Sequence, residues 1–254
     1  MRFFLGNVLP YLAWAVFLLG LAWRTVTWLT RPVPMSLTLL PGPADSSRRA
    51  ALMALELLGF RSLWRGDRVL ALTAWLMHLS LAVVLAGHVV GIATLGGQFC
   101  WFGADAATSA ALSHWLGMTS GLLLAGLLAL LGLRRLSIAE LRRLSAPSDY
   151  LALGLLLAAA GSGIALRAAC GTDELGNPSC TDLVQVRAYL ASLLVLRPGE
   201  MPGQPFFVLH FTLVNLLLMY FPFSKLVHLT GGVVSRVLTL RPCPVYPTPA
   251  GRST

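Results

Sequence analysis

The chain has 254 residues, of which 56% are hydrophobic and only 11% are charged. Soluble domains carry roughly 25% charged residues, so this composition excludes an ordinary soluble globule and favours a protein whose apolar side chains are solvated by the lipid bilayer. The formal net charge is +9, but the basic residues lie between apolar runs without interleaved aromatic residues, which argues against nucleic-acid binding.

Five apolar runs are long enough to cross a membrane, because about 20 helical residues span the ~30 Å hydrocarbon layer. The predicted spans are residues 5–27, 69–93, 111–133, 150–170 and 205–229. The predicted fold is therefore an all-α integral membrane protein, a bundle of five transmembrane helices. The organisation divides into residues 1–28 (first span), 29–68 (cytoplasmic segment), 69–235 (four-span core) and 236–254 (cytoplasmic tail).

The first span is predicted to be an uncleaved anchor, because its apolar stretch is too long for a signal peptide and no small-residue cleavage site follows it. Orientation is predicted from the positive charges, which are retained on the cytoplasmic side. Arginines gather in segments 29–68 and 134–148 and near the C-terminus, whereas segment 95–110 has no lysine or arginine. The N-terminus is therefore expected outside and the C-terminus in the cytoplasm.

Two of the connections are predicted to contain short helices. Residues 45–63 begin at Asp45, a possible cap, and leucines alternate there with arginines. This pattern suits a helix that lies in the cytoplasmic interface or against a partner subunit; the alternative is an ordinary solvent-exposed helix. A second short helix is predicted near residues 183–196, on the outer side.

Four histidines lie inside two of the predicted spans, where an ionisable residue is costly and suggests a function. His78 and His88 are on the second span, and His210 and His228 are on the fifth. The two spans run in opposite directions, so His88 matches His210 in depth near the outer edge, and His78 matches His228 nearer the cytoplasm. Each pair is predicted to ligate one haem iron from opposite faces.

The spacing of these histidines requires a tilt or a bend. His210 and His228 are 18 residues apart, or five full turns, so they share one face of a continuous helix. Ten residues between His78 and His88 rise ~15 Å, whereas eighteen rise ~27 Å. Pro222 is the candidate kink. The alternative is a set of histidines that hydrogen-bond across the bundle without a metal; zinc is disfavoured because no cysteine or carboxylate lies at these depths.

Polar residues of the third and fourth spans allow two interpretations each. His114 is either a polar residue at the outer interface or a proton acceptor near a quinol site. Arg167 either pairs with a haem propionate or extends to the interface. Gly117 and Gly121 form a small-xxx-small face, for which helix packing is the favoured explanation.

The four cysteines do not form a metal-binding cluster, so any iron–sulfur centre is expected to come from a partner. By the predicted topology, Cys100, Cys170 and Cys180 face outward and Cys243 is cytoplasmic and reduced. Cys170 and Cys180 bracket a polar stretch, and either a disulfide or two free thiols is consistent with an oxidising compartment.

The histidine spacings, the Gly87-His88 step and the segment Pro-Phe-Ser-Lys-Leu-Val-His at 222–228 resemble the gamma-subunit family of respiratory nitrate reductase. The resemblance covers roughly residues 69–235. Within that family the chain is most similar to the cytochrome b subunit of the membrane complex associated with dissimilatory sulfite reductase. A bacterial or archaeal plasma membrane is the implied location.

The resemblance implies two haems b in the five-helix bundle. His88 and His210 would hold the haem distal from the cytoplasmic partner, and His78 and His228 the proximal one. The family's site for quinone, either menaquinone or ubiquinone, lies beside the outer haem near His88. Nitrate-reductase members use a lysine shortly after that histidine, whereas Lys225 is the single lysine of this chain.

The implied function is electron transfer between membrane quinone and a cytoplasmic iron–sulfur subunit resembling the catalytic subunit of heterodisulfide reductase. Relatives also associate with a periplasmic multihaem cytochrome c, a ferredoxin-like subunit and a second quinone-reactive membrane subunit. One alternative is the cytochrome b of a nitrate reductase, hydrogenase or other dehydrogenase. The other is a haem-free anchor or transporter, although transporters tend to show repeats and none is found here. No catalytic triad is expected in the chain itself.

Overall fold

The structure is a computed structural model that describes residues 1–30, 45–169, 171–172, 178–179 and 183–239. Within these residues five helical segments are long and apolar enough to cross a membrane, as predicted. They are α1 (Leu9–Thr30) with the preceding π-helical turn η1 (Phe4–Val8), α4 (Arg68–Thr94), α5 (Ala106–Ser137), α7 (Pro147–Ala168), and α9 (Pro205–Tyr220) with the 3₁₀ turn η3 (Phe221–Phe223).

Short elements lie between these five segments and after the last of them. They are α2 (Ser46–Gly59), α3 (Arg61–Gly66), η2 (Gln98–Phe102), α6 (Ala139–Leu144), the two-residue strands β1 (Gly171–Thr172) and β2 (Pro178–Ser179), α8 (Leu183–Leu194), η4 (Lys225–Val227) and α10 (His228–Thr239). β1 and β2 pair in an antiparallel ribbon. The described chain is otherwise almost entirely helical, in agreement with the predicted all-α class.

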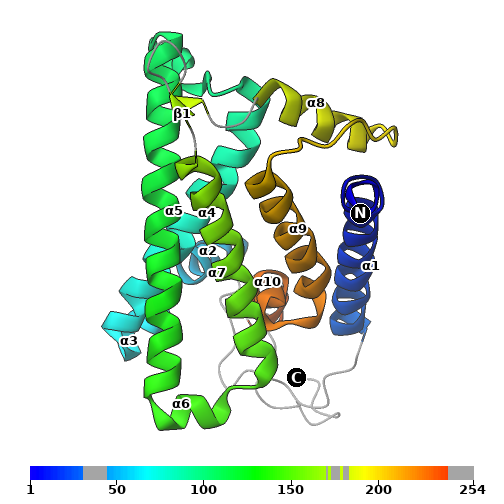
Figure 1. Ribbon diagram of the computed structural model, residues 1–254. Helices are drawn as coiled ribbons and strands as arrows, with labels where there is room; N and C mark the ends of the chain where they lie inside the picture. The colour runs from blue at the N-terminus through cyan, green and yellow to red at the C-terminus, as the bar shows by residue number, and fades with distance from the viewer. Residues whose placement is uncertain (31–44, 170, 173–177, 180–182, 240–254) are drawn as a thin grey trace, which may run out of the picture.

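The long helices stand roughly side by side (Figure 1), and α4 packs on α5, α5 on α7, α7 on α9, and α9 on α1. Helix α8 lies across one end of the bundle, and α6 joins α5 to α7 at the opposite end (Figure 1). We call these the α8 end and the α6 end. The main neighbour of α4 is α5, and the main neighbours of α9 are α7 and α1. The two helices predicted to carry the histidines therefore do not make their main contacts with each other.

A small buried core fastens α8 to the bundle. Val186 and Tyr189 of α8 pack with Met201 and with Phe207 of α9. The Tyr189 hydroxyl donates a hydrogen bond of 2.7 Å to the carbonyl of Gly6 in η1. Burial raises the pKa of Tyr189 to about 12, so the hydroxyl keeps its proton and remains a donor. Helix α8 is thus attached to the starts of both the first and the fifth spans.

Aspartates begin two of the long helices. The Asp67 carboxylate accepts from the amide of Leu70 (2.9 Å), which caps α4, and it pairs with Arg134 of α5 at 2.8 Å. The Leu70 hydrogen bond lowers the pKa of Asp67, and the charge of Arg134 lowers it further. At the other end Asp105 caps α5 by accepting from the amide of Thr108. These caps fix where the second and third spans start.

The helix predicted over residues 45–63 is confirmed at its start but is not continuous. Asp45 caps α2 by accepting from two backbone amides. The chain then turns at Phe60, which has φ 51° in the left-handed region, before α3 begins. Contacts with α4 accompany this corner, because the Phe60 ring lies 5.1 Å from that of His78 and Trp75 donates to the carbonyl of Leu58. Tertiary packing overrides local helix propensity here.

The prediction of one continuous helix over residues 205–229 is wrong in its last part. α9 ends at Tyr220, and Pro222 starts a break that includes an extended Ser224 (φ −106°, ψ 173°). Proline cannot donate the helical N–H bond and clashes with the preceding turn, so the predicted kink at Pro222 is confirmed as a full interruption. His210 and His228 consequently do not share one face of a single helix, and the break absorbs their unequal spacing.

Polar and small residues compensate for the broken helix. The Arg24 guanidinium of α1 donates to the carbonyl of Pro222 at 3.1 Å, and the Ser224 hydroxyl accepts from the amide of Leu226. A Cβ on Gly20 of α1 would lie only 2.7 Å from the Pro222 ring, so glycine permits the close approach of α1. Freed backbone groups in an apolar environment need such partners.

Candidate functional site

The structure brings the four histidines predicted to lie in the membrane together as two pairs. His228 itself begins α10, beyond the fifth candidate span, which ends at Phe223. The ring centroids of His88 (α4) and His210 (α9) are 6.0 Å apart. Those of His78 (α4) and His228 (start of α10) are 5.9 Å apart. The first pair lies toward the α8 end and the second toward the α6 end, so the depths match the order predicted from sequence.

Both histidines of α4 have one ring nitrogen fixed by their own helix. Nδ1 of His78 lies 2.8 Å from the carbonyl oxygen of Ala74, and Nδ1 of His88 lies 2.7 Å from that of Val84. A carbonyl can only accept, so Nδ1 carries the hydrogen and Nε2 keeps its lone pair. The two imidazoles are therefore in the tautomer that binds a metal through Nε2.

The other two histidines obtain the same tautomer from different acceptors. Nδ1 of His210 lies 3.0 Å from the carbonyl of Ala159 and 3.0 Å from the hydroxyl of Ser162, both on α7. The Ser162 hydroxyl itself donates to the Ala159 carbonyl (2.9 Å), which leaves its oxygen free to accept. Nδ1 of His228 donates to the carbonyl of Lys225 at 2.9 Å. Such outer hydrogen bonds orient metal-binding histidines.

A glycine of α7 provides the space for the His210 ring. A Cβ on Gly163 would lie 3.1 Å from Cε1 and 3.4 Å from Nδ1 of His210. Sequence reasoning did not identify Ser162 or Gly163. Their only signal was the run of small residues at 161–163 within the fourth span, which is equally typical of helix packing.

The ring spacings fit two axial ligands of one metal ion. An imidazole–metal bond is about 2.0–2.1 Å for zinc and similar for iron, so two imidazoles on opposite sides of one ion have centroids about 6 Å apart. The described residues contain no group of three or more His, Cys, Asp or Glu side chains arranged to hold a metal ion. Two protein ligands per site suit a metal whose other ligands belong to a macrocycle such as haem.

The two pairs differ in the angle between their imidazole planes. The planes of His88 and His210 are 23° apart, whereas those of His78 and His228 are 89° apart. His88 and His228 are exposed in the isolated chain, while His78 and His210 are half-buried. His88 lies within the apolar span α4, where an exposed imidazole is costly in lipid, so a bound group is the physically reasonable neighbour for its ring.

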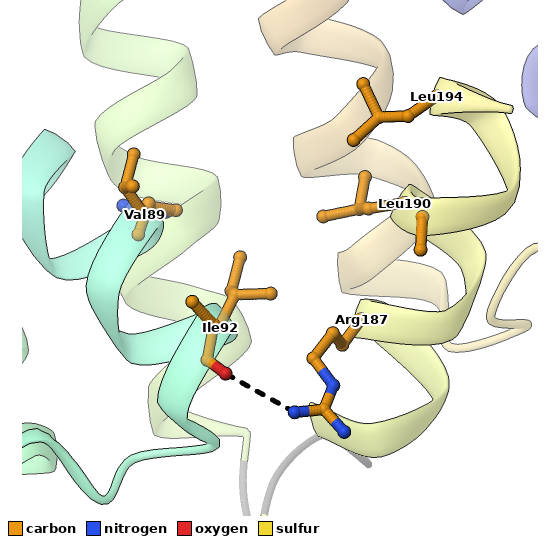
Figure 2. A pocket seen from close by; sticks show the side chains of 8 residues that line it. Val89, Ile92, Arg187, Leu190 and Leu194 are labelled. Carbon is orange, nitrogen blue, oxygen red and sulfur yellow. Dashed lines mark hydrogen bonds between the residues drawn. The ribbon is translucent and has the colours of Figure 1, made fainter.

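A pocket of about 360 Å³ lies between α4 and α8 beside His88 (Figure 2). Its walls are mainly apolar, with Ile92 contributed by α4 and Leu190 and Leu194 by α8. Arg187 lies at one edge and donates to the carbonyl of Ala93 at 3.3 Å (Figure 2). An apolar pocket with one cationic donor suits a flat, weakly polar ligand.

Comparison with known proteins identifies the family. The model of the nitrate reductase gamma subunit family matches residues 62–246. The chain belongs to this family. The resemblance stated from the histidine spacings and the 222–228 segment is thereby confirmed.

The relatives that this chain resembles have two kinds of name. A Hdr-like menaquinol oxidoreductase cytochrome b-like subunit of Archaeoglobus fulgidus is 32% identical over 269 residues, covering 90% of this chain and 76% of the relative. The subunit of the same name in Archaeoglobus profundus is 25% identical, covering 88% and 74%. The nitrate reductase gamma chain of Bacillus subtilis is 30% identical over 162 residues, covering 63% and 71%.

Arg167 of this gamma-family chain makes hydrogen bonds to α5 that were not predicted from the sequence. Its predicted roles, pairing with a haem propionate or extending to the interface, stay predictions. Its guanidinium contacts α5 and donates to the carbonyls of Ser113 and His114 at 3.3 Å each. Gly117 makes this possible, because a Cβ there would lie 2.6 Å from Cζ of Arg167. Gly121 faces Ile164 at ordinary packing distance, so the two glycines do line the contact between α5 and α7.

The remaining predicted residues lie away from the histidine pairs or outside the described residues. His114 stacks edge-on with Trp115 and is not among the residues that line the pocket beside His88. Its role as a proton acceptor stays a prediction. Cys100 is an exposed free thiol. Cys170, Cys180 and Cys243 lie outside the described residues.

Proposed function

We propose that this chain is a dihaem cytochrome b that transfers electrons between the quinone pool and a cytoplasmic iron–sulfur subunit. The observation that carries the proposal is the pair of facing imidazole couples, His88 with His210 and His78 with His228. In every case Nδ1 is held by an oxygen acceptor, which leaves Nε2 for a metal. A haem b, when bound, supplies a one-electron carrier at each couple.

The chain's own residues hold and orient the two groups. His78 and His88 are fixed on one rigid helix, α4, by their own backbone carbonyls. On the opposite side, α7 holds His210 through Ala159 and Ser162. Such outer hydrogen bonds are one means by which a protein tunes a haem potential.

We assign the pocket beside His88 to quinone. It is bounded by a predicted haem ligand on one side and by Arg187 on the other, so a quinone headgroup would lie close to the outer haem with a cationic donor in reach. The names of the Archaeoglobus relatives support menaquinol as the substrate class. We propose that the α8 end lies outside and the α6 end in the cytoplasm, because the arginines of the described segments 45–68 and 134–148 lie at the latter.

The partner is inferred from the same relatives. Their Hdr-like naming supports a complex of the heterodisulfide-reductase-like type. The resemblance stated from the sequence implies that the partner is a cytoplasmic iron–sulfur subunit in a respiratory complex of sulfur metabolism. A periplasmic multihaem cytochrome c, a ferredoxin-like subunit and a second quinone-reactive membrane subunit are the further expected partners. The Bacillus relative favours one alternative, a nitrate-reductase cytochrome b. Identification of the subunits that co-purify with the native complex distinguishes the two.

The central test is the cofactor content of the purified chain. A pyridine haemochrome assay is expected to give two haems b per chain, and a menaquinol analogue is expected to reduce them. Protein that stays colourless after expression with ample haem supply would contradict the proposal.

Filling the pocket beside His88 is expected to impair the reaction with quinol selectively. Ala191 of α8 lines the pocket, so Ala191→Trp places an indole where the headgroup is proposed to bind. We expect the KM for a menaquinol analogue to rise about tenfold, equivalent to about 1.4 kcal/mol of lost binding, with two haems retained. Ala188→Trp is the matched control, because Ala188 is an exposed residue of the same helix and does not line the pocket. Equal quinol kinetics in the two variants would rule out this site.

A further inference from the structure

The single lysine of the chain lies in the interruption of the fifth span. Lys225 begins the turn η4, between the end of α9 and the start of α10. Its side chain is 70% exposed, yet its ammonium lies 2.7 Å from the carboxylate of Asp149 at the start of α7. The ion pair therefore ties the broken segment to a different helix.

Asp149 is held firmly on its side of this pair. Its side chain is only 3% exposed, and Oδ2 accepts from the amide of Ala146 (3.1 Å) as well as from Lys225. Arg135 of α5 lies 3.5 Å from the same oxygen. A buried carboxylate is tolerated only with such partners, and removing one of them is costly. The carboxylate is thus a fixed anchor point at the α6 end.

The backbone of Lys225 contacts the candidate haem ligand directly. Its carbonyl accepts the Nδ1 hydrogen of His228 at 2.9 Å. A second tie flanks the break, because the Tyr220 hydroxyl donates to the carbonyl of Ser148 at 2.9 Å. The segment that carries His228 is therefore fastened to the start of α7 on both sides of Pro222.

His228 differs from the other three histidines in what orients it. The carbonyls that hold His78, His88 and His210 belong to the long helices α4 and α7, which fix those oxygens by regular backbone hydrogen bonding. The acceptor of His228 belongs to a three-residue 3₁₀ turn, which has weaker hydrogen-bond geometry. Such a turn needs an external contact to hold its carbonyl in place.

We propose that Asp149 is a positioning residue for His228: it binds the Lys225 side chain, and the Lys225 carbonyl thereby holds the imidazole in its position beside His78. The inference rests on the proposed function insofar as the bound group is haem. It deepens that function by assigning the control of one haem site to a carboxylate that acts on His228 through Lys225. Only the His78–His228 site should depend on it.

The test uses a His88→Ala background, in which only the His78–His228 haem is expected to remain. Asp149→Asn in this background is expected to release haem to excess apomyoglobin about tenfold faster, the lower end of what outer-shell changes cost in metal affinity. Its low-spin haem signal in electron paramagnetic resonance should also shift. Asp67→Asn is the matched control, since it breaks the Asp67–Arg134 ion pair at the same end without contacting η4. An unchanged Asp149→Asn protein, or an equal change in Asp67→Asn, overturns the inference.

A second variant tests whether Asp149 acts through the lysine. Lys225→Met is expected to reproduce the faster haem release, and the double variant with Asp149→Asn should be no worse than the more affected single variant, because both changes remove one interaction. If the increases in the rate of haem release add up in the double variant, Asp149 does not act on His228 through Lys225.

A readout that does not need haem separates this inference from the proposed function. In the haem-free full chain, hydrogen exchange of the backbone amides at residues 224–228 is expected to accelerate in Asp149→Asn and not in Asp67→Asn. A parent protein that binds no haem contradicts the proposed function, while the exchange result still decides whether Asp149 holds the turn. Equal exchange in the two variants overturns the positioning role.

Discussion

Purified His88→Ala protein is expected to contain one haem b per chain where the parent contains two. The reason is that His88 and His210 face each other across one site, so that removing either imidazole leaves its iron with a single protein ligand. The His78–His228 site lies toward the other end of the bundle and keeps both of its ligands. His210→Ala should give the same result, and a variant lacking both histidines should lose no more than either single variant.

The pyridine haemochrome assay and the optical redox titration measure this outcome. His78→Ala and His228→Ala should each remove the other haem, which is distinguished by its midpoint potential. Combining His88→Ala with His78→Ala should leave none. His114→Ala is the control, because this histidine of α5 belongs to neither pair and should leave both haems in place. Loss of the same haem from His88→Ala and His228→Ala would show that the pairing is wrong.

The features predicted correctly from the sequence are those that the apolar environment of the membrane determines. Backbone groups in lipid must bond within their own segment, so long apolar runs had to be helices, and five were found at the predicted places. The order of the histidine pairs along the bundle also follows from sequence, because antiparallel spans of fixed rise bring His88 near His210 and His78 near His228. These features depend on length and direction alone.

The sequence did not reveal which parts of other helices orient the histidines. Ser162 and Gly163 contact His210 only because α7 is rotated to present them, and the rotation of a helix is set by the packing of all its neighbours. In the sequence, Asp149 has the pattern of an ordinary residue at the start of a helix. Its contact with Lys225 joins residues 76 positions apart. Non-local contacts of this kind leave no periodic pattern in the chain.

Interruptions of helices were harder to predict than the helices themselves. Pro222 predicted a bend. The extended Ser224 and the new helix that begins at His228 depend on contacts with α1 and α7. Phe60 carries no turn signal, and its left-handed backbone is accompanied by packing on His78. At Phe60 a tertiary contact near a candidate haem ligand prevailed over local propensity, whereas at Pro222 such contacts determine the course of a break that proline itself starts.

The second large effect is expected from a glycine that no ligand prediction singled out. Gly163→Leu is expected to remove the His88–His210 haem while leaving the other, because the new Cβ alone would lie 3.1 Å from the His210 ring. Either the imidazole turns away from its acceptors on α7 or α9 moves outward, and overpacking of this kind costs about 1–3 kcal/mol. In both cases the His210 imidazole loses its present position beside the His88 ring.

Gly161→Leu supplies the matched control two residues earlier on the same helix. A Cβ at Gly161 would meet no atom of the described residues within 4 Å. Replacing this glycine by leucine therefore changes the helix propensity of α7 as Gly163→Leu does, but without a contact at the His210 ring. We expect two haems per chain in Gly161→Leu and one in Gly163→Leu, measured as the haem-to-protein ratio with the optical spectrum of the remaining haem. Gly163→Ala tests the same contact with the least added volume and should weaken retention of that haem without abolishing folding. Two fully retained haems in both Gly163 variants would mean that α7 does not determine how His210 is held.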